Sequence, residues 1–342
     1  MKFILPQNIE ELGKRYRNII LLLHPGRSIK KEDLMDKGMI FPQKLKEGDT
    51  IGLVAPSSHI NFDNITKCKE AVEALGYKAV LGNSADKSYM GYLSGDDDVR
   101  ARDINEMFER KDVSGIFCLR GGYGSCRIVD KLDLDLIRKN PKVFVGYSDI
   151  TTLHLVLNQI CNMVTYHAPM VSSNMLTQFD DYTKKSFLDT LFMDEELEFL
   201  NPEGTKIETL SGGCGEGVLT GGNLSLIAAS IGTPYEIDTE DRILFIEEVD
   251  EHTYRVDRFL QQLKHSGKLA AVKGIILGSF KNCGPEHEGD ADLMEIFTDI
   301  IKPLNKPTVY GVECGHCYPT GSLPMGVTCK LDADKGRIIF SK

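Results

Sequence analysis

The order of apolar runs and helical segments between residues 50 and 146 is the feature that most constrains the fold of this chain. Short apolar runs stand at 51–54, 79–81, 115–119 and 143–146, and segments with helical character stand between them at 63–75, 97–110 and 125–139. Alternating strands and helices predict a parallel sheet covered by helices. We therefore expect an α/β fold that begins with a Rossmann- or flavodoxin-like parallel-sheet domain.

The pattern changes beyond residue 212. Short strands separated by glycine turns are predicted at 217–220, 242–246, 274–277, 326–331 and 337–340, with helices near 254–265 and 291–301. This pattern predicts a mixed, β-rich α/β C-terminal domain. The expected organisation is an N-terminal extension (1–40), an α/β domain (41–172), a polar helical linker (173–210) and the C-terminal domain (211–342).

Charge and composition restrict the partners. The 342 residues include 50 acidic and 40 basic side chains, a formal charge of −10 that disfavours nucleic acids and anionic membrane surfaces. The longest apolar run, at 19–23, is far shorter than the roughly 20 residues of a membrane-spanning helix. We therefore expect a small-molecule or peptide partner, with no nucleic acid and no membrane.

The N-terminal segment and the cysteines indicate where the protein is located. Residues 1–38 carry eight Lys or Arg and five Asp or Glu, lack a secretory signal pattern, and include a predicted amphipathic helix at 8–23 that Pro25-Gly26 ends. Nine cysteines spread over a long chain do not form the disulfide framework of a small secreted domain. We expect reduced thiols and a cytoplasmic location.

A strand-to-helix turn at Gly146-Tyr147-Ser148-Asp149 is the first candidate for chemistry. It resembles the G-x-S-x-G nucleophile elbow, except that Ile150 replaces the last glycine. The alternative for Ser148 is a helix N-cap, with Asp149 favouring the helix dipole.

A second turn, Arg120-Gly121-Gly122-Tyr123-Gly124, also follows a strand. Its glycines allow backbone N–H groups to approach an oxyanion or a phosphate closely, whereas the alternative is a plain tight turn. The turn lacks the spacing of a dinucleotide site and of a P-loop, so nucleotide binding is a minor interpretation.

A third cluster combines a strand that ends in Glu247-Glu248 with a glycine-bounded loop that carries His316. Strand periodicity places the two carboxylates on opposite faces. Together with Ser148 these residues supply a nucleophile, a base and a carboxylate in the chain order Ser, Glu, His, and triads are recognised by role and geometry rather than by sequence distance.

The chain resembles the LD-carboxypeptidase family of serine peptidases, which includes the microcin-immunity peptidases. The similar stretches, in family order, are LKEGDTIGLVAPSS (45–58), LRGGYG (119–124), GYSDIT (146–151), LTGGNL (219–224), LFIEEV (244–249), KGIILG (273–278), GH (315–316) and LPMG (323–326). The resemblance implies Ser148 as nucleophile, His316 as general base and Glu247 as the orienting carboxylate. The family's usual Leu-Glu-Asp-Val reads Ile-Glu-Glu-Val here, and Glu248 is the fallback.

The resemblance also implies an oxyanion hole made by the backbone N–H groups of Gly121 and Asp149. It implies release of the terminal D-alanine of a muramyl tetrapeptide during recycling of cell-wall peptides, and a homodimer. Arg120, Gly122 and Tyr123 are candidates for substrate binding, although Arg120 is equally compatible with a structural salt bridge. No cofactor and no metal are expected.

Four alternatives remain beside this interpretation. A peptidyl or aminoacyl adenylate is the substrate in the immunity branch, although the absence of Trp disfavours nucleobase stacking. A dithiol oxidoreductase would use Cys314-Gly-His-Cys317, although Pro319 and Gly321 prevent the helix that such a motif normally opens. Zinc binding at Cys314, His316 and Cys317 is disfavoured by their close spacing. A non-catalytic binding protein on the same fold is the last alternative.

Overall fold

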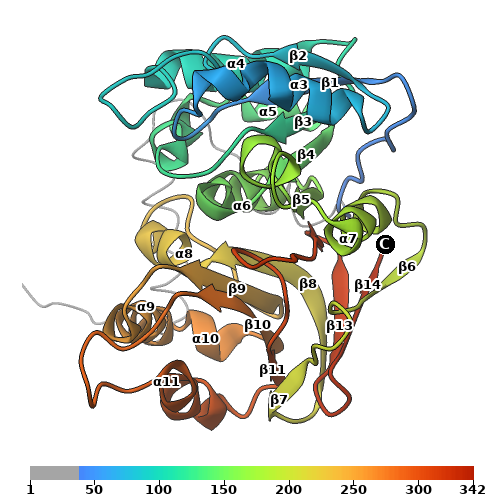
Figure 1. The fold of residues 1–342 in the computed structure, drawn as a ribbon. Helices are drawn as coiled ribbons and strands as arrows, with labels where there is room; N and C mark the ends of the chain where they lie inside the picture. Colours follow the sequence, from blue (N-terminus) through green and yellow to red (C-terminus); the bar gives the residue numbers. More distant parts are fainter. Residues whose placement is uncertain (1–37) are drawn as a thin grey trace, which may run out of the picture. The chain divides into compact units, whose positions relative to one another are not determined.

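A six-stranded sheet occupies the first part of residues 38–342, which the computed structural model describes (Figure 1). The predicted helix at 8–23 lies outside the described residues. The elements up to residue 175 are β1 (Thr50–Val54), η1 (Phe62–Asn64), α3 (Ile65–Glu73), β2 (Lys78–Leu81), α4 (Asp97–Glu109), β3 (Gly115–Cys118), η2 (Ser125–Arg127), η3 (Val129–Lys131), α5 (Leu134–Lys139), β4 (Val143–Gly146), η4 (Ser148–Ile150), α6 (Thr151–Gln159), β5 (Thr165–His167) and the π-helical turn η5 (Val171–Met175).

The strand order in this sheet is β12-β5-β4-β3-β1-β2, and the five strands β1 to β5 are parallel. The sheet is buried on both faces: alternate residues of β4, such as Val145 and Phe144, belong to two different hydrophobic clusters. The cluster around Phe144 includes apolar residues of α4, α5 and α6. The expected parallel sheet covered by helices is therefore confirmed.

The rest of the described chain forms a second sheet, of eight strands, and the helices around it. Its elements are α7 (Asp181–Leu191), β6 (Glu196–Phe199), β7 (Glu208–Ser211), β8 (Cys214–Asn223), α8 (Leu224–Ser230), β9 (Ile243–Val249), α9 (Thr253–His265), α10 (Lys268–Ala271), β10 (Gly274–Lys281), α11 (Leu293–Ile300), η6 (Lys302–Leu304), β11 (Thr308–Tyr310), β12 (Leu323–Met325), β13 (Thr328–Asp332) and β14 (Arg337–Ser341), although β12 itself joins the first sheet.

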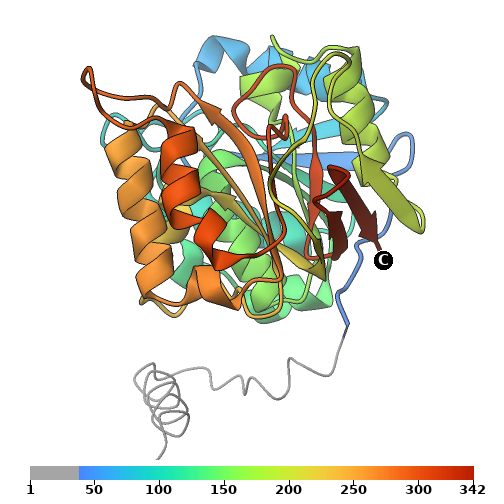
Figure 2. The same cartoon turned by 90° about the horizontal axis from the view of Figure 1, so that it is seen from below.

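The order in the second sheet is β6-β14-β13-β8-β9-β10-β11-β7. The four strands β8 to β11 are parallel, and the remaining pairs are antiparallel, which confirms the expected mixed sheet. Helices α9 and α11 lie on one side of this sheet (Figures 1 and 2). On β9, Leu244 and Ile246 pack toward these helices, and Ile243 and Phe245 face the opposite side.

The segment 173–210 differs from the expected linker. Besides the predicted helix, α7, it contains β6 and β7, which are the two edge strands of the second sheet. Each of these strands has one buried side chain, Phe199 in β6 and Leu210 in β7. Short, mostly polar edge strands of this kind lack the alternation that reveals a strand in sequence.

The two sheets are also connected by strand β12. It lies between β11 and β13 in the sequence of the second half, yet it pairs antiparallel with β5 of the first sheet. Contacts group the whole range 39–342 into one unit. Strand β12 thus follows the predicted domain boundary at residue 211 in the sequence, yet it belongs to the sheet of the preceding domain.

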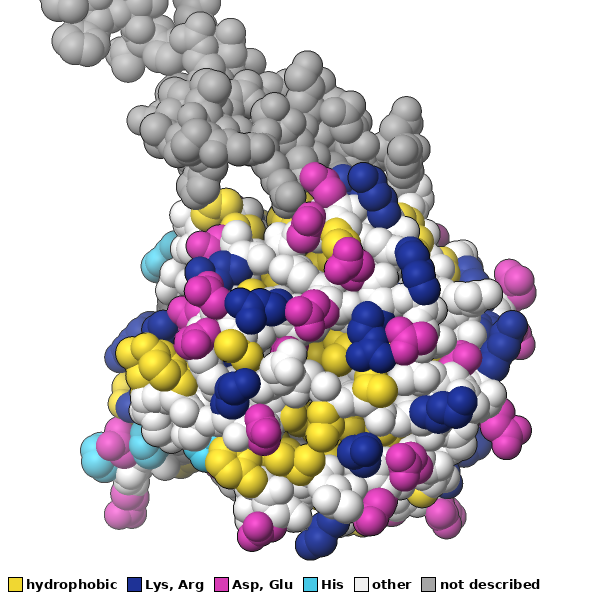
Figure 3. All heavy atoms as spheres, turned by 90° about the horizontal axis from the view of Figure 1, so that it is seen from above, with side chains coloured by type: hydrophobic (Ala, Val, Ile, Leu, Met, Phe, Trp, Pro, Cys, Tyr) yellow, Lys and Arg dark blue, Asp and Glu magenta, His cyan; other side chains and the backbone are white. Residues whose placement is uncertain are grey.

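One face of the molecule is mixed in charge. On the face in Figure 3, acidic and basic side chains are interspersed and no large area of one sign stands out. No helix within residues 38–342 is long and apolar enough to span a bilayer.

Candidate active site

Ser148 lies on a sharp turn between β4 and α6, at the carboxyl end of the parallel strands. Its φ of +64° is unusual for a residue with a side chain. Backbone strain of this kind is typical of a nucleophile elbow. A side chain at Gly146 would come within 2.9 Å of Ile150, so the turn is tight enough to require glycine before it.

The Ser148 hydroxyl contacts a histidine rather than capping a helix. Its Oγ lies 3.0 Å from His316 Nε2, and His316 Nδ1 lies 2.6 Å from Glu247 Oε2. The η4 turn that begins at Ser148 has no side-chain cap. The structure thus brings together all three residues of the predicted triad, which are separated by as many as 168 positions in the chain.

Glu247 and His316 reach this position by different routes. Glu247 is the fifth residue of β9 and is completely buried, whereas His316 lies in the loop between β11 and β12 and keeps 17% of its side-chain surface exposed. A side chain on Gly315 would approach Glu247 Oε2 to 2.6 Å, and the φ of Gly315 is +115°. Glycine at 315 therefore lets the loop place His316 directly against the carboxylate.

The electrostatics favour a basic imidazole. Burial alone lowers the pKa of His316, but the charge and the hydrogen bond of Glu247 outweigh it, with smaller contributions from Glu248 and Asp250, so the pKa is raised above 6.5. A raised pKa makes His316 a better acceptor for a hydroxyl proton.

Glu248 faces the other side of β9, as the periodicity predicts. It accepts hydrogen bonds from Asn223 Nδ2 at 2.8 Å and from the backbone N–H groups of Ser225 at 2.7 Å and Val249 at 2.9 Å. Burial raises the pKa of Glu248, and these hydrogen bonds oppose the increase. Glu248 therefore joins β9 to α8, and Glu247 is the carboxylate that contacts the histidine.

The glycine turn after β3 packs directly against Ser148. A Cβ atom on Gly121 would lie 2.8 Å from Ser148 Cβ, 3.0 Å from its Oγ and 3.2 Å from the backbone nitrogen of Asp149. The two predicted oxyanion donors, Gly121 and Asp149, are therefore neighbours on one side of the serine. A side chain at residue 121 would therefore clash with Ser148.

The three substrate-binding candidates have different surroundings. Half-buried Arg120 donates from Nη1 to the His59 carbonyl at 3.2 Å and forms no ion pair within residues 38–342. Gly122 lies against Ser58, and Tyr123 is exposed, with its ring 5.8 Å from that of Tyr92. The structural salt bridge considered for Arg120 is absent from the described part of the chain.

Some residues that support the site were not predicted. Thr183 Oγ1 and Ser186 Oγ, on α7, accept hydrogen bonds from the backbone N–H groups of Thr320 at 3.1 Å and Ser322 at 3.0 Å, in the loop that carries His316. The segment that contains Thr183 and Ser186 has no motif, and its polar side chains are typical of a solvent-exposed helix. Only the three-dimensional contact between α7 and the loop reveals their role.

The two cysteines of the C-x-x-C motif are buried. Burial raises the pKa of Cys314 well above its usual value and that of Cys317 to about 12. A dithiol oxidoreductase needs a lowered thiol pKa, so this environment contradicts that alternative. Within the described residues no group of three or more His, Cys, Asp or Glu side chains could hold a metal ion.

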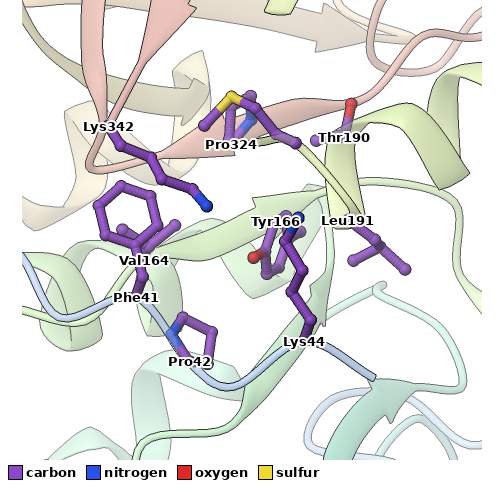
Figure 4. A pocket seen from close by; sticks show the side chains of 10 residues that line it. Phe41, Pro42, Lys44, Val164, Tyr166, Thr190, Leu191, Pro324 and Lys342 are labelled. Atoms are coloured by element: carbon purple, nitrogen blue, oxygen red, sulfur yellow. The ribbon is translucent and has the colours of Figure 1, made fainter. Parts of the chain in front are cut away.

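Figure 4 shows a small pocket lined by other residues. Phe41, Tyr166 and Pro324 line it together with Lys44 and Lys342. Neither the triad nor the glycine turn contributes to its lining, so the pocket is not part of the candidate active site.

Comparisons with known proteins agree with the sequence resemblance. Residues 51–168 match the family model described as LD-carboxypeptidase N-terminal domain, and residues 216–331 match the LD-carboxypeptidase C-terminal domain. A probable murein peptide carboxypeptidase of Bacillus subtilis is 40% identical over 301 residues, which cover 87% of this chain and 93% of that protein.

Two solved structures have the same fold. The wild-type microcin C7 self-immunity protein MccF without ligand aligns with a TM-score of 0.81 and 25% identity over 89% of this chain and 98% of its own. The muramoyltetrapeptide carboxypeptidase of Oxalobacter formigenes aligns with a TM-score of 0.74 and 27% identity over 85% of this chain and 97% of its own.

Proposed function

Because this chain belongs to the LD-carboxypeptidase family of serine peptidases, we propose that it releases the terminal D-alanine of muramyl tetrapeptides by hydrolysing the L,D amide bond. The observation that carries this proposal is the hydrogen-bonded series from Ser148 through His316 to Glu247. The names of the relatives supply the substrate class, a cell-wall peptide.

The chemistry follows from the geometry of these three residues. His316 Nε2 takes the proton of Ser148 Oγ as the hydroxyl attacks the scissile carbonyl, and the imidazolium then gives that proton to the leaving amine of D-alanine. Water attacks the resulting ester with His316 again as base, which frees the peptide and restores the serine. Glu247 holds the imidazole by its Nδ1 and stabilises its positive charge.

The charge of the tetrahedral intermediate needs donors beside Ser148. The backbone N–H groups of Gly121 and Asp149 are our candidates, because both residues lie against the serine on the same side. Removal of one such donor typically costs about 10²- to 10³-fold in rate.

A carboxypeptidase must also bind the free carboxylate of its substrate. Arg120 is our candidate, since it is adjacent to Gly121 and its guanidinium forms no ion pair within residues 38–342. Bidentate pairing between a guanidinium and a carboxylate would select peptides with a free C-terminus.

The test is D-alanine release from a muramyl tetrapeptide by the wild-type protein and by Ser148→Ala. We expect release by the wild type and a decrease of at least about a thousandfold in the variant. An aminoacyl sulfamoyl adenylate is assayed in parallel, and cleavage of that compound alone would instead indicate the activity considered for the immunity branch. A wild type that hydrolyses neither compound would contradict the proposal.

We further propose a cytoplasmic location and a homodimer. All nine cysteines are free, as expected in a reducing compartment. The homodimer rests on the family resemblance, and light scattering after gel filtration tests it. A mass near 38.1 kDa would show a monomer and contradict it.

A further inference from the structure

One peptide bond in the turn after β3 is held from both sides by buried charged side chains. The Gly124 carbonyl accepts a hydrogen bond from Arg100 Nη1 at 2.8 Å, and the N–H of Ser125, on the same peptide bond, donates to Asp149 Oδ2 at 2.8 Å. Hydrogen bonds to ionised groups are roughly twice as strong as neutral ones. A cation on the oxygen and an anion on the nitrogen thus fix the orientation of this peptide.

Arg100, on α4, has no exposed surface. Besides Gly124, its guanidinium donates to the carbonyls of Gly95 at 3.2 Å and Pro56 at 2.5 Å, and it forms an ion pair with Asp97. Burial lowers the pKa of Arg100, and the carboxylates of Asp97 and Asp149 oppose that decrease. One side chain therefore joins three loops at the carboxyl end of the first sheet.

Asp149 holds the same region from the other side and is only 1% exposed. Its Oδ2 also accepts from Ser57 Oγ at 2.6 Å, and its backbone carbonyl accepts from Ser125 Oγ at 2.6 Å. Burial raises the pKa of Asp149, while the hydrogen bonds from Ser57 and Ser125 lower it. The residue that follows the serine is thus attached to the turn by both its side chain and its backbone.

The turn leaves no space for a side chain at Gly124. Gly124 has a φ of +135°, and a Cβ atom there would lie 2.7 Å from Arg100 Nη1 and 2.6 Å from Leu93 Cδ2. Three residues earlier, Gly121 packs against Ser148. The Gly124–Ser125 peptide bond and the proposed oxyanion donor Gly121 are therefore parts of one short, tightly packed turn.

We propose that the side chains of Arg100 and Asp149 are positioning residues that fix the glycine turn against Ser148, so that the N–H groups of Gly121 and Asp149 converge on one oxyanion. Electrostatic stabilisation of this kind requires donors that are already oriented before the reaction, within about 0.5 Å. This inference rests on the proposed function of the two N–H groups.

The test compares Asp149→Asn with Asp103→Asn. Asp103 is a matched control because it is fully buried and its carboxylate accepts four hydrogen bonds, from the backbone N–H and side-chain amide of Asn83 and from the backbone N–H and hydroxyl of Ser84, but none from the glycine turn. We expect both variants to lose stability. Only Asp149→Asn should lower kcat, by about 10²-fold, with KM changed by less than about threefold. A similar kcat for the two variants would overturn the proposal.

Arg100→Lys provides a second variant, because an ammonium group cannot reproduce the planar fork of the guanidinium. We expect a decrease in kcat in this variant as well. Since both side chains act on one peptide, the double variant with Asp149→Asn should lose no more than about threefold beyond the worse single variant. Fully multiplicative losses would show that the two residues act independently.

The rate at which a fluorophosphonate labels Ser148 separates this inference from the proposed substrate. In this reaction Ser148 Oγ bonds to phosphorus, fluoride leaves, and His316 takes the hydroxyl proton; the phosphoryl oxygen needs the same oxyanion donors, but no peptide takes part. A wild type that is labelled without releasing D-alanine would refute the proposed substrate, and the ratio of labelling rates between wild type and Asp149→Asn would still test the positioning role. Equal rates would contradict that role.

Discussion

The space beside the Ser148 hydroxyl is open because residue 121 has no side chain. We expect Gly121→Ala to lower kcat by at least about 10²-fold, since the added methyl group would lie 2.8 Å from Ser148 Cβ and must displace the serine or the donor N–H. The fold should be retained, because Gly121 has no positive φ that alanine could not adopt. Kinetic constants and thermal unfolding check both expectations.

Gly284→Ala is the control for that substitution. Gly284 also lacks a positive φ, and a Cβ atom there meets nothing within 4 Å. Its activity should match the wild type. If Gly121→Ala were as active as this control, the turn after β3 would not border the reacting group.

The protonation of His316 sets a second expectation for a single residue. Its raised pKa means that the imidazole becomes protonated, and unable to accept the Ser148 proton, as the pH falls through a value above 6.5. The acid limb of kcat/KM should therefore lie above 6.5. Glu247→Gln removes the charge that raises this pKa, so the limb should move to lower pH while the maximal rate decreases. A limb that does not move would show that another group controls it.

At the scale of elements, helix α7 supports the loop that carries His316. Thr183→Val removes the acceptor for the buried N–H of Thr320, which typically costs about 1 to 3 kcal/mol. We expect lower stability together with lower kcat, because the loop loses its contact with the helix. Thr239→Val is the control, since Thr239 is equally buried and its hydroxyl donates to the carbonyl of Lys268. This control should lose stability alone, and an equal loss of kcat in both variants would contradict the role of α7.

The same elements show how far a sequence can be interpreted. The apolar runs and the elbow could be predicted because buried parallel strands and a strand-to-helix turn leave continuous local patterns. Strand β12 could not, because it has three residues, one of them Pro324, and forms only at the sheet edge where β5 is present to pair with it. The burial of Arg100 could not be predicted either. A charged residue in a charged helix is normally exposed, and the carbonyl groups that surround Arg100 come from other parts of the chain.

The carboxylate of the triad could be predicted only in part from the sequence. Periodicity on β9 correctly separated the faces of Glu247 and Glu248, but it could not show which face meets the histidine. That choice depends on the packing of α8 under Glu248 and on the close approach of Gly315 to Glu247. Both contacts join residues far apart in the chain.

For the range 39–342 as a whole, the connections between the sheets predict one cooperative unfolding unit. One hydrophobic cluster contains Phe117 and Val145 of the first sheet together with Phe245 and Phe340 of the second, and β12 adds a C-terminal strand to the first sheet. Neither sheet can unfold without exposing part of the same core. The strands of both sheets should therefore lose protection from hydrogen exchange at the same urea concentration.

Phe340→Ala tests whether the two sheets unfold together. Phe340 is fully buried in β14, and its truncation should cost about 3 to 5 kcal/mol. Because the unit is shared, the urea midpoint should decrease equally for peptides from β1 to β4 and for peptides from β8 to β11, as measured by mass spectrometry. If the first sheet kept its original midpoint while the second lost stability, the two sheets would be independent, and the contact between Ser148 and His316 would depend on docking of two separately folded parts rather than on one continuous core.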